Sequence, residues 1–397
     1  MRIAERIGRL GSETAFAVSA EAAEFEAKGN RVYPFHLGDL NILTPPDVME
    51  ASVKAMRDGK TGYCPTAGIP RLREALAADV AASHRVPYTL ENVAIQPGGK
   101  PTIGKFFLAL MNPGDEVLYP NPGYPIYESQ IEFLGGKALP YWYVEGQEGF
   151  RLDFQSIEKQ ITPRTRLLVL NDPHNPMGSE CSRAELERIA ELALKHGLYV
   201  LCDEAYYDMR YSGTGTSLAS LPGMAERCVI LYTFSKKFAM TGWRLGATIG
   251  PRDLIEVIAK LNVNDESCSN HFIQYGALAG LRGDQEGPHR ILSILKERRD
   301  VAVDILNTIP GVRCFRPEVT FYLFPNVTGA MRRLGILDYT RFRQTILRET
   351  GVSFCTRAHF GRVLPGEREF YIRLAYSGID APLIREGLMR LKKFLER

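Results

Sequence analysis

The sequence contains no long hydrophobic run. Its apolar stretches have the length of β-strands, and none approaches the roughly 18 residues that a membrane-spanning helix requires. The first eight residues carry two arginines and a glutamate, and they lack the apolar core of a secretion signal. We therefore expect neither a membrane span nor a secretion signal.

An excess of charge of one sign is also missing. The 49 basic and 46 acidic residues are mixed along the chain and leave a formal net charge of only +3. Without a basic stripe, nucleic acids and anionic membranes are not expected as partners. No Gly-x-Gly-x-x-Gly motif follows a strand-like run, which argues against a dinucleotide-binding dehydrogenase.

Cysteine pairs of the metal-binding or redox type are absent as well. The seven cysteines are scattered, odd in number and without a Cys-x-x-Cys pair. This pattern predicts no zinc site and no disulfide framework. Reduced thiols in a cytoplasmic protein fit it best.

What the chain does contain is the alternation of an α/β protein. Between about residues 90 and 250, short apolar runs are separated by helical patterns, which predicts a mostly parallel sheet covered on both faces. After about residue 285 a long amphipathic helix (290–309), two strands (320–324 and 369–376) and a closing helix (383–395) indicate a smaller α+β region. At 397 residues two domains are expected. The predicted boundaries are 46–285 for the large domain, and 1–45 with 286–397 for the small one.

Polar or glycine-rich segments follow five of the apolar runs. They are Pro97–Lys100, Pro120–Tyr124, Asn171–Gly178, Asp203–Tyr206 and Ser235–Lys236. The carboxyl ends of parallel strands lie at one edge of a sheet, where α/β proteins bind their ligands. The five segments together therefore predict one binding site.

The segment from Thr233 to Gly246 is the most informative of these. A lysine just beyond a buried strand can form an imine with a carbonyl compound if its pKa is low enough. Ser235 and Arg244 are candidates to hold a phosphate on the same ligand. This combination favours pyridoxal phosphate, and the alternative is an ordinary surface turn with solvated lysines.

Other residues suit the same ligand. The Asp203 carboxylate could keep a pyridine nitrogen protonated, although the residue could equally be a helix N-cap. Gly98 and Gly99 precede a helix and offer free backbone amides to a phosphate. Arg373 could bind a substrate carboxylate through two parallel hydrogen bonds, and its alternative is an ion pair within the small domain.

Taken jointly, these residues carry a resemblance over nearly the whole chain. The sequence resembles the class I and II aminotransferases of pyridoxal-phosphate fold type I, and it is closest in pattern to bacterial aspartate aminotransferases. The matching segments are 37–39, 62–73, 98–100, 171–178, 203–206, 235–246 and 373–376. The resemblance implies a large domain with a mostly parallel seven-stranded sheet sandwiched by helices, a smaller α+β domain, and ping-pong amino transfer from an amino acid to a 2-oxo acid.

The resemblance also implies roles for individual residues. Lys236, eight residues before Arg244, would attach the cofactor and move the substrate proton, and Lys237 would not. The cofactor would be held by Tyr63 of the other subunit of a homodimer and by Gly99, Lys100, Tyr124, Asn175, Asp203, Tyr206, Ser235 and Arg244. Tyr127 would support Asp203. The substrate α-carboxylate would be received by Gly38, Asn175 and Arg373.

The substrate is less closely defined by the sequence. Lys100, with Ser12 and Thr14, lies where the prokaryotic aspartate enzymes bind the distal carboxylate, so aspartate or glutamate is the first expectation. His174, Met177 and a Cys-Thr-Arg357 segment depart from the family pattern, and Arg357 is a candidate second carboxylate ligand. The alternatives are a bulkier substrate (aromatic or diaminopimelate-type), a lyase reaction with the same cofactor, and a non-catalytic cofactor-binding regulator.

Overall fold

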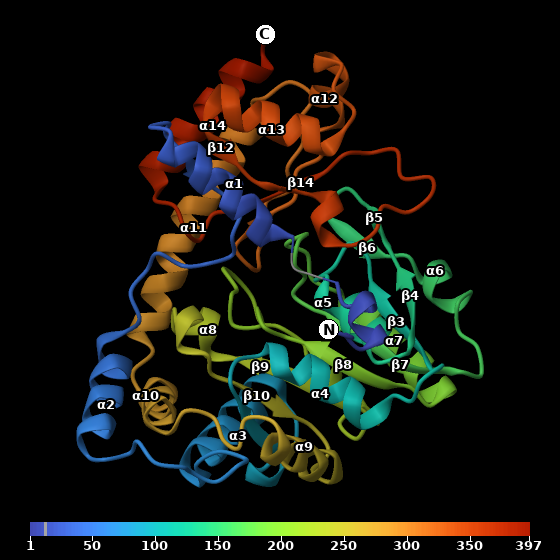
Figure 1. Cartoon of the computed structure of the whole chain (residues 1–397), viewed down its shortest axis with the longest axis vertical. Helices are drawn as coiled ribbons and strands as arrows, with labels where there is room; N and C mark the ends of the chain where they lie inside the picture. Colours follow the sequence, from blue (N-terminus) through green and yellow to red (C-terminus); the bar gives the residue numbers. More distant parts are fainter. Residues whose placement is uncertain (12–13) are drawn as a thin grey trace.

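A seven-stranded sheet lies at the centre of the wider end of the molecule (Figure 1). The computed structural model describes residues 1–11 and 14–397. The strands are β2 (Val93–Gln96), β3 (Glu116–Pro120), β4 (Lys137–Tyr141), β7 (Thr165–Asn171), β8 (Tyr199–Asp203), β9 (Cys228–Thr233) and β10 (Gly246–Ile249). Their order is β2-β10-β9-β8-β7-β3-β4, and only β10 runs antiparallel to its neighbours. The predicted mostly parallel sheet is confirmed.

Two of these strands had no clear signal in the sequence. β4 is an edge strand that contains Pro140, a residue that sheets tolerate at an edge because it lacks a backbone N–H. β10 has only four residues and begins at Gly246, directly after the lysine-containing segment. Short strands of mixed composition produce little periodicity, which explains why both escaped prediction.

Helices cover both faces of the sheet. One face packs against α2 (Pro46–Arg57), α3 (Pro70–His84), α7 (Arg183–His196) and α10 (His271–Arg282), and the other against α4 (Lys100–Leu110), α5 (Ile126–Phe133) and α9 (Arg252–Asn264). Alternate residues of one strand pack into the hydrophobic cores on the two faces of the sheet. Leu168 and Leu170 of β7 lie in the core of the first face, and Leu167 and Val169 lie in the core of the second. Burial on both faces is why these strands are continuously apolar.

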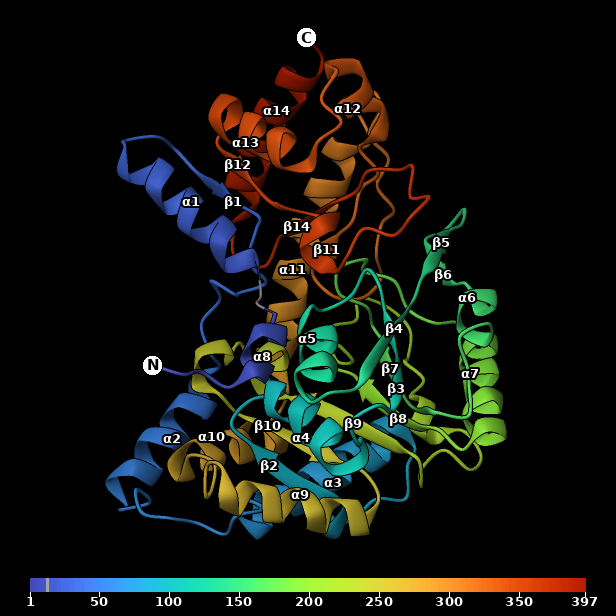
Figure 2. The same cartoon turned by 45° about the vertical axis from the view of Figure 1, so that its right-hand side comes forward.

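The long helix α11 (Glu286–Leu306) leads from this sheet into a second core (Figure 2). That core contains the short sheet β11 (Tyr322–Leu323), β14 (Ile372–Ala375) and β13 (Cys355–Thr356), with helices α12 (Thr328–Leu334), α13 (Tyr339–Thr350) and α14 (Ala381–Leu395). β1 (Tyr33–Pro34) pairs with β12 (Val352–Ser353) and joins the N-terminal segment to this core. We propose the two cores as the large and small domains, with α11 beginning at the expected boundary.

The N-terminal residues bridge the two regions. The short helix η1 (Glu5–Arg9) lies against α5 of the large sheet region, where the Gly11 N–H donates to Ser129 Oγ (2.9 Å). Helix α1 (Ala15–Ala27) instead packs its buried Ala15 and Val18 against Cys355 and Phe360 of the second region. The segment expected to fold onto the small domain therefore contacts both regions.

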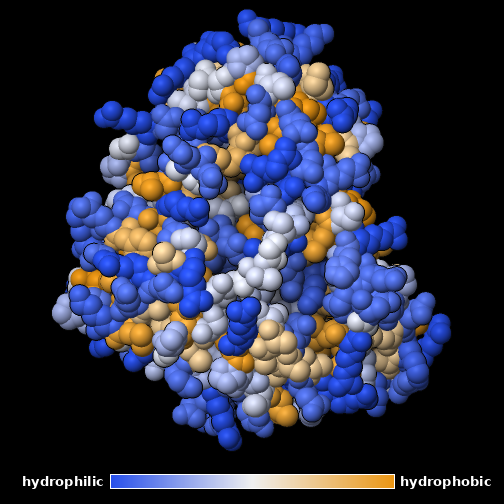
Figure 3. All heavy atoms as spheres, turned by 180° about the vertical axis from the view of Figure 1, so that it is seen from behind, coloured by the Kyte–Doolittle hydropathy of each residue, from blue (hydrophilic) through white to orange (hydrophobic). Residues whose placement is uncertain are grey.

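The surface of the molecule is mainly polar. Hydrophilic side chains cover most of its rear face, and the hydrophobic ones form small separate groups (Figure 3). Within residues 1–11 and 14–397, no helix is both long and apolar enough to cross a membrane.

Candidate active site

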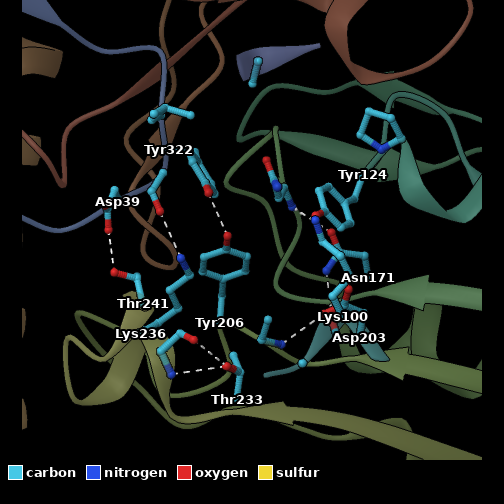
Figure 4. A pocket seen from close by; sticks show the side chains of 18 of the residues that line it. Asp39, Lys100, Tyr124, Asn171, Asp203, Tyr206, Thr233, Lys236, Thr241 and Tyr322 are labelled. Atoms are coloured by element: carbon cyan, nitrogen blue, oxygen red, sulfur yellow. Dashed lines mark hydrogen bonds between the residues drawn. The ribbon is translucent and has the colours of Figure 1, made fainter. Parts of the chain in front are cut away.

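A cavity of about 630 Å³ lies where the carboxyl ends of the large sheet meet the second region. Of the residues proposed from the sequence, its lining includes Gly38, Gly99, Lys100, Tyr124, Tyr127, Asn175, Asp203, Tyr206, Ser235, Lys236, Arg244 and Arg373. Figure 4 shows Lys236, Tyr206 and Tyr322 from one side of the cavity and Lys100, Tyr124 and Asp203 from the other. Segments far apart in the chain thus converge, as the strand ends predicted.

Lys236 lies in the short helix α8 (Phe234–Lys237), directly after β9. Its Nζ donates to the Gly38 carbonyl (2.9 Å) and lies 6.0 Å from the centre of the Tyr206 ring. Lys237 points elsewhere, toward the carboxylates of Asp79 (3.4 Å) and Asp208 (3.5 Å). Of the two adjacent lysines, only Lys236 lines the cavity.

Asp203 ends β8 and is only 5% exposed. Its Oδ2 accepts a hydrogen bond from Tyr127 (2.5 Å) and its Oδ1 accepts one from the Ala205 N–H (3.2 Å). Burial raises the pKa of Asp203 to about 6, although both hydrogen bonds oppose the shift. A cation placed against this carboxylate would favour its ionised form.

The turn before α4 forms a narrow cradle of two glycines beside Arg244. Gly98 has a φ of +98°, and a Cβ there would lie 2.2 Å from Nη2 of Arg244. A Cβ on Gly99 would lie 2.7 Å from Leu231. A side chain at Gly98 would displace the guanidinium from the start of α4, and one at Gly99 would displace Leu231. Ser235 lines the cavity with them, so one hydroxyl, one guanidinium and a helix N-terminus meet here.

Arg373 supplies the positive charge at the opposite end of the site. It lies in β14, with its guanidinium 4.6 Å from the Tyr322 ring centre and 4.7 Å from that of Phe360. Nη1 donates to Asn175 Oδ1 (3.4 Å), whereas the buried Nε has no partner among the described residues. A planar carboxylate is the partner that such a guanidinium suits best.

Tyr322 was not identified from the sequence. Its hydroxyl pairs with that of Tyr206 (2.7 Å), and a Cβ on Gly38 would lie 2.1 Å from it. Gly38 is thus required by the approach of an aromatic side chain almost 300 positions away. The only sequence signal was an aromatic run, 320–324, that was assigned to an ordinary strand.

Arg357 is not a carboxylate ligand of this cavity, contrary to the hypothesis from the sequence. It is 1% exposed, and its Nη2 binds Glu367 (2.6 Å) and Asn121 Oδ1 (2.8 Å). Its donors are taken by these acceptors and by two backbone carbonyls, so none faces the cavity. Buried His174 and Met177 also lie outside the lining.

The remaining sequence candidates lie near the cavity or beyond it. Tyr63 is 89% exposed and does not line the cavity of its own chain. Thr14 donates to the carbonyl of His359 (3.4 Å), and Ser12 falls outside the described residues. Among the described N-terminal residues, Ala15 and Phe16 line the cavity instead.

Comparison with known proteins agrees with this geometry. Residues 32–391 match the family described as aminotransferase class I and II. The chain belongs to this family. A probable aspartate/prephenate aminotransferase of Aquifex aeolicus is 33% identical over 99% of this chain and 98% of its own. The enzyme is thus an aminotransferase, which moves an amino group from an amino acid to a 2-oxo acid.

Solved structures share the whole architecture. The aspartate aminotransferase from Thermus thermophilus with maleate superimposes with a TM-score of 0.90, at 29% identity, over 99% of this chain and 100% of its own. The alanine aminotransferase from Pyrococcus furiosus gives the same TM-score and identity over 100% of both chains. The expected fold is confirmed.

The cavity has the donor set that the family's cofactor, pyridoxal phosphate, requires. The glycine cradle can take a phosphate, and Asp203 can face a pyridine nitrogen. Among the described residues, no group of three or more His, Cys, Asp or Glu side chains could hold a metal ion. The residues of this aminotransferase therefore fit an organic cofactor that carries a phosphate.

Asp203→Asn is expected to stabilise the cofactor-free aminotransferase at neutral pH. In the wild type, the carboxyl has a pKa of about 6 in the folded chain against a usual 3.8, so stability falls as pH rises between these values. The wild type therefore loses about 2–3 kcal/mol of its free energy of unfolding over this pH range. The variant avoids this loss because the asparagine amide does not titrate. Urea unfolding should show the variant's advantage growing from pH 4 to pH 7. A stability advantage of the variant that is constant with pH would contradict the raised pKa of Asp203.

Proposed function

We propose that this aminotransferase binds pyridoxal phosphate with Lys236 as its covalent attachment point. The observation that carries the proposal is the placement of Lys236, Asp203 and Arg373 around one cavity. They provide an amine, a carboxylate and a guanidinium, which are the three groups needed for the cofactor's aldehyde, its ring nitrogen and a substrate carboxylate.

The bound cofactor supplies an electron sink that makes the Cα hydrogen of an amino acid acidic. Asp203 would face the ring nitrogen, where its ionised form is favoured. Tyr206 and Asn175 would bind the ring oxygen, and Tyr124 would stack on the ring. Gly99, Ser235 and Arg244 would hold the phosphate.

The reaction then depends on how the chain holds the substrate. Arg373 and Asn175 fix the α-carboxylate, with the Gly38 backbone beside them, so that the Cα–H bond faces Lys236. Once the substrate amino group has replaced Lys236 on the cofactor's aldehyde carbon, the freed Lys236 amine can take the proton from Cα as a general base and return it later as an acid. The Tyr322 and Phe360 rings exclude water from the guanidinium and strengthen its hold on the carboxylate.

The proposed amino-acid substrate is aspartate or glutamate. Lys100 lies in the cavity with its Nζ 5.6 Å from the Tyr124 ring centre, where a distal carboxylate would gain a positive partner. The names of the Aquifex and Thermus proteins, and the dicarboxylate maleate bound to the latter, support this choice. A bulkier substrate is the second candidate, because Phe16 lines the cavity while 60% exposed and offers an apolar contact.

A substrate panel tests this choice. Amino acids are mixed with the cofactor-loaded enzyme, and the single-turnover change in cofactor absorbance gives a rate for each. We expect aspartate and glutamate to lead, and Lys100→Gln to lower their kcat/KM about 10–100-fold, the effect of one charge-assisted hydrogen bond. Alanine should change by less than about threefold in this variant. Equal losses for all substrates would assign Lys100 to the cofactor alone.

We also propose a homodimer in which Tyr63 reaches the phosphate of the neighbouring subunit's cofactor. Tyr63 is almost fully exposed, and Met49, Val53 and Met56 form an exposed apolar stripe on α2 nearby in the sequence. Exposed apolar side chains of this kind mark association surfaces. A single-chain mass in light scattering would contradict the dimer. No disulfide joins the cysteines of the described residues, which supports the cytoplasm as the proposed compartment.

A further inference from the structure

A buried histidine–glutamate pair involves the residue next to Asp203 in the chain. Glu204, the next residue, does not line the cavity, and its Oε2 lies 2.8 Å from Nε2 of His84 at the end of α3. The two side chains are only 5% and 2% exposed. The second oxygen, Oε1, accepts a hydrogen bond from Ser217 (2.6 Å).

The surroundings of His84 can hold the doubly protonated imidazolium. Ser83 Oγ, which donates to the Asp79 carbonyl (2.8 Å), lies 2.7 Å from His84 Nδ1 and can accept a hydrogen bond from that nitrogen. Nε2 lies against Glu204 Oε2, and a carboxylate buried this deeply is stabilised by a positively charged partner.

Two further features stabilise a positive charge at this position. His84 is the last residue of the 15-residue helix α3, where the helix dipole favours cations by about 0.3–2 kcal/mol. The ring also stacks on Tyr207, with 3.8 Å between centroids and 20° between planes. Tyr207 in turn donates to the Ser83 carbonyl (3.0 Å), so the stacked ring is tied to the end of the same helix. The position is thus built to hold a charged imidazole.

We propose that His84 is a positioning residue for the reaction: by neutralising Glu204, it allows Asp203 to stay ionised against the ring nitrogen of the cofactor. His84 touches neither cofactor nor substrate and acts through its neighbours. The inference rests on the role proposed above for Asp203. It assigns a function to two buried charged residues that the proposed chemistry does not use.

The electrostatics around Asp203 agree with this role. After burial and the Tyr127 and Ala205 hydrogen bonds, the negative charge of Glu204 is the remaining influence on the pKa of Asp203, and it raises that pKa. Asp203 also faces Tyr206. The other ionisable groups that face the pair are Asp79 on α3, Tyr88 after α3, Asp172 after β7, and Cys202 and Tyr207 on the β8 segment. The basic groups nearby, Arg210 and Lys237, pair with Glu180 and with Asp79 and Asp208, so His84 is the side chain able to carry a positive charge that contacts Glu204.

The test compares cofactor binding as a function of pH. The affinity of the cofactor-free chain for pyridoxal phosphate is measured from pH 5 to pH 9 for the wild type, His84→Gln, Glu204→Gln and the double variant. Glutamine can still hydrogen-bond but carries no charge. We expect His84→Gln to move the midpoint of the pH dependence up by about one unit, which lowers affinity about tenfold on the acid side.

The double variant separates charge from packing. His84→Gln with Glu204→Gln removes both charges, so its midpoint should return to that of the wild type or fall below it. A purely structural role predicts that the double variant is at least as impaired as the single one. A wild-type midpoint in His84→Gln, or no recovery in the double variant, would overturn the proposal.

A second readout needs only the wild-type protein. In nitrogen-15 spectra of the histidine side chains, His84 is identified by its proximity to the stacked Tyr207 ring, and it should show two protonated nitrogens at pH 7. A neutral ring at that pH would overturn the inference even if the variants fail to fold. Asp203→Asn keeps the two hypotheses apart: if it retains the wild-type pH dependence, the role of Asp203 itself is wrong. If it loses that dependence while His84→Gln behaves as the wild type, only the present inference fails.

Discussion

Replacing Lys236 with arginine is expected to lower kcat by about 10⁴-fold. Arginine preserves the positive charge and nearly the length of the side chain, but its guanidinium stays protonated at any usable pH. It can neither attach to the cofactor's aldehyde nor take a proton from Cα. General acid–base catalysis alone contributes about 10²–10⁴-fold, and the loss of the covalent attachment adds to this.

The chain provides a matched control one residue away. Lys237→Arg makes the same chemical change on a lysine that binds Asp79 and Asp208 outside the cavity. It should keep kcat within about threefold of the wild type, because an arginine can bind both carboxylates. Stopped-flow absorbance with an amino acid measures both variants, and circular dichroism checks that they are folded. Full activity of Lys236→Arg or of Lys236→Ala would show that Lys236 is not the attachment point of the cofactor.

Arg373→Lys is expected to lower kcat/KM for every amino-acid substrate by about 10²-fold. The lysine keeps the charge but loses the two parallel hydrogen bonds to the α-carboxylate, worth about 3 kcal/mol in a buried site. It also loses the planar group that lies between the Tyr322 and Phe360 rings. The loss should be similar for aspartate and alanine, because both carry the same α-carboxylate.

Arg357→Lys is the matched control for this second prediction. Arg357 is as deeply buried as Arg373, but its guanidinium binds Glu367 and Asn121 instead of facing the cavity. The variant should lose stability in urea by about 1–3 kcal/mol, because buried donors and acceptors become unpaired. Its kcat/KM for aspartate should stay within about threefold of the wild type. A large and selective loss for aspartate would restore Arg357 as a substrate ligand.

The predicted site residues that the structure brings to one cavity share one feature. Lys236, Asp203 and Asn175 each lie at or just beyond the end of a buried strand, and the carboxyl ends of parallel strands meet at one edge regardless of the details of packing. Local order along the chain was therefore enough to bring them to one cavity. The same reasoning explains why the short strands β4 and β10 were missed, since neither has the apolar run that marks a buried strand.

The sequence by itself determined the α/β alternation, the segments that carry the chemistry and the family to which they belong. These are properties of neighbouring residues, namely periodicity, turn composition and motif spacing. Only the tertiary structure decided that Arg357 turns toward Glu367, that Tyr322 closes over Gly38 and that His84 pairs with Glu204. The direction of a side chain at a loop or helix end depends on packing between distant elements, and no local pattern encodes it.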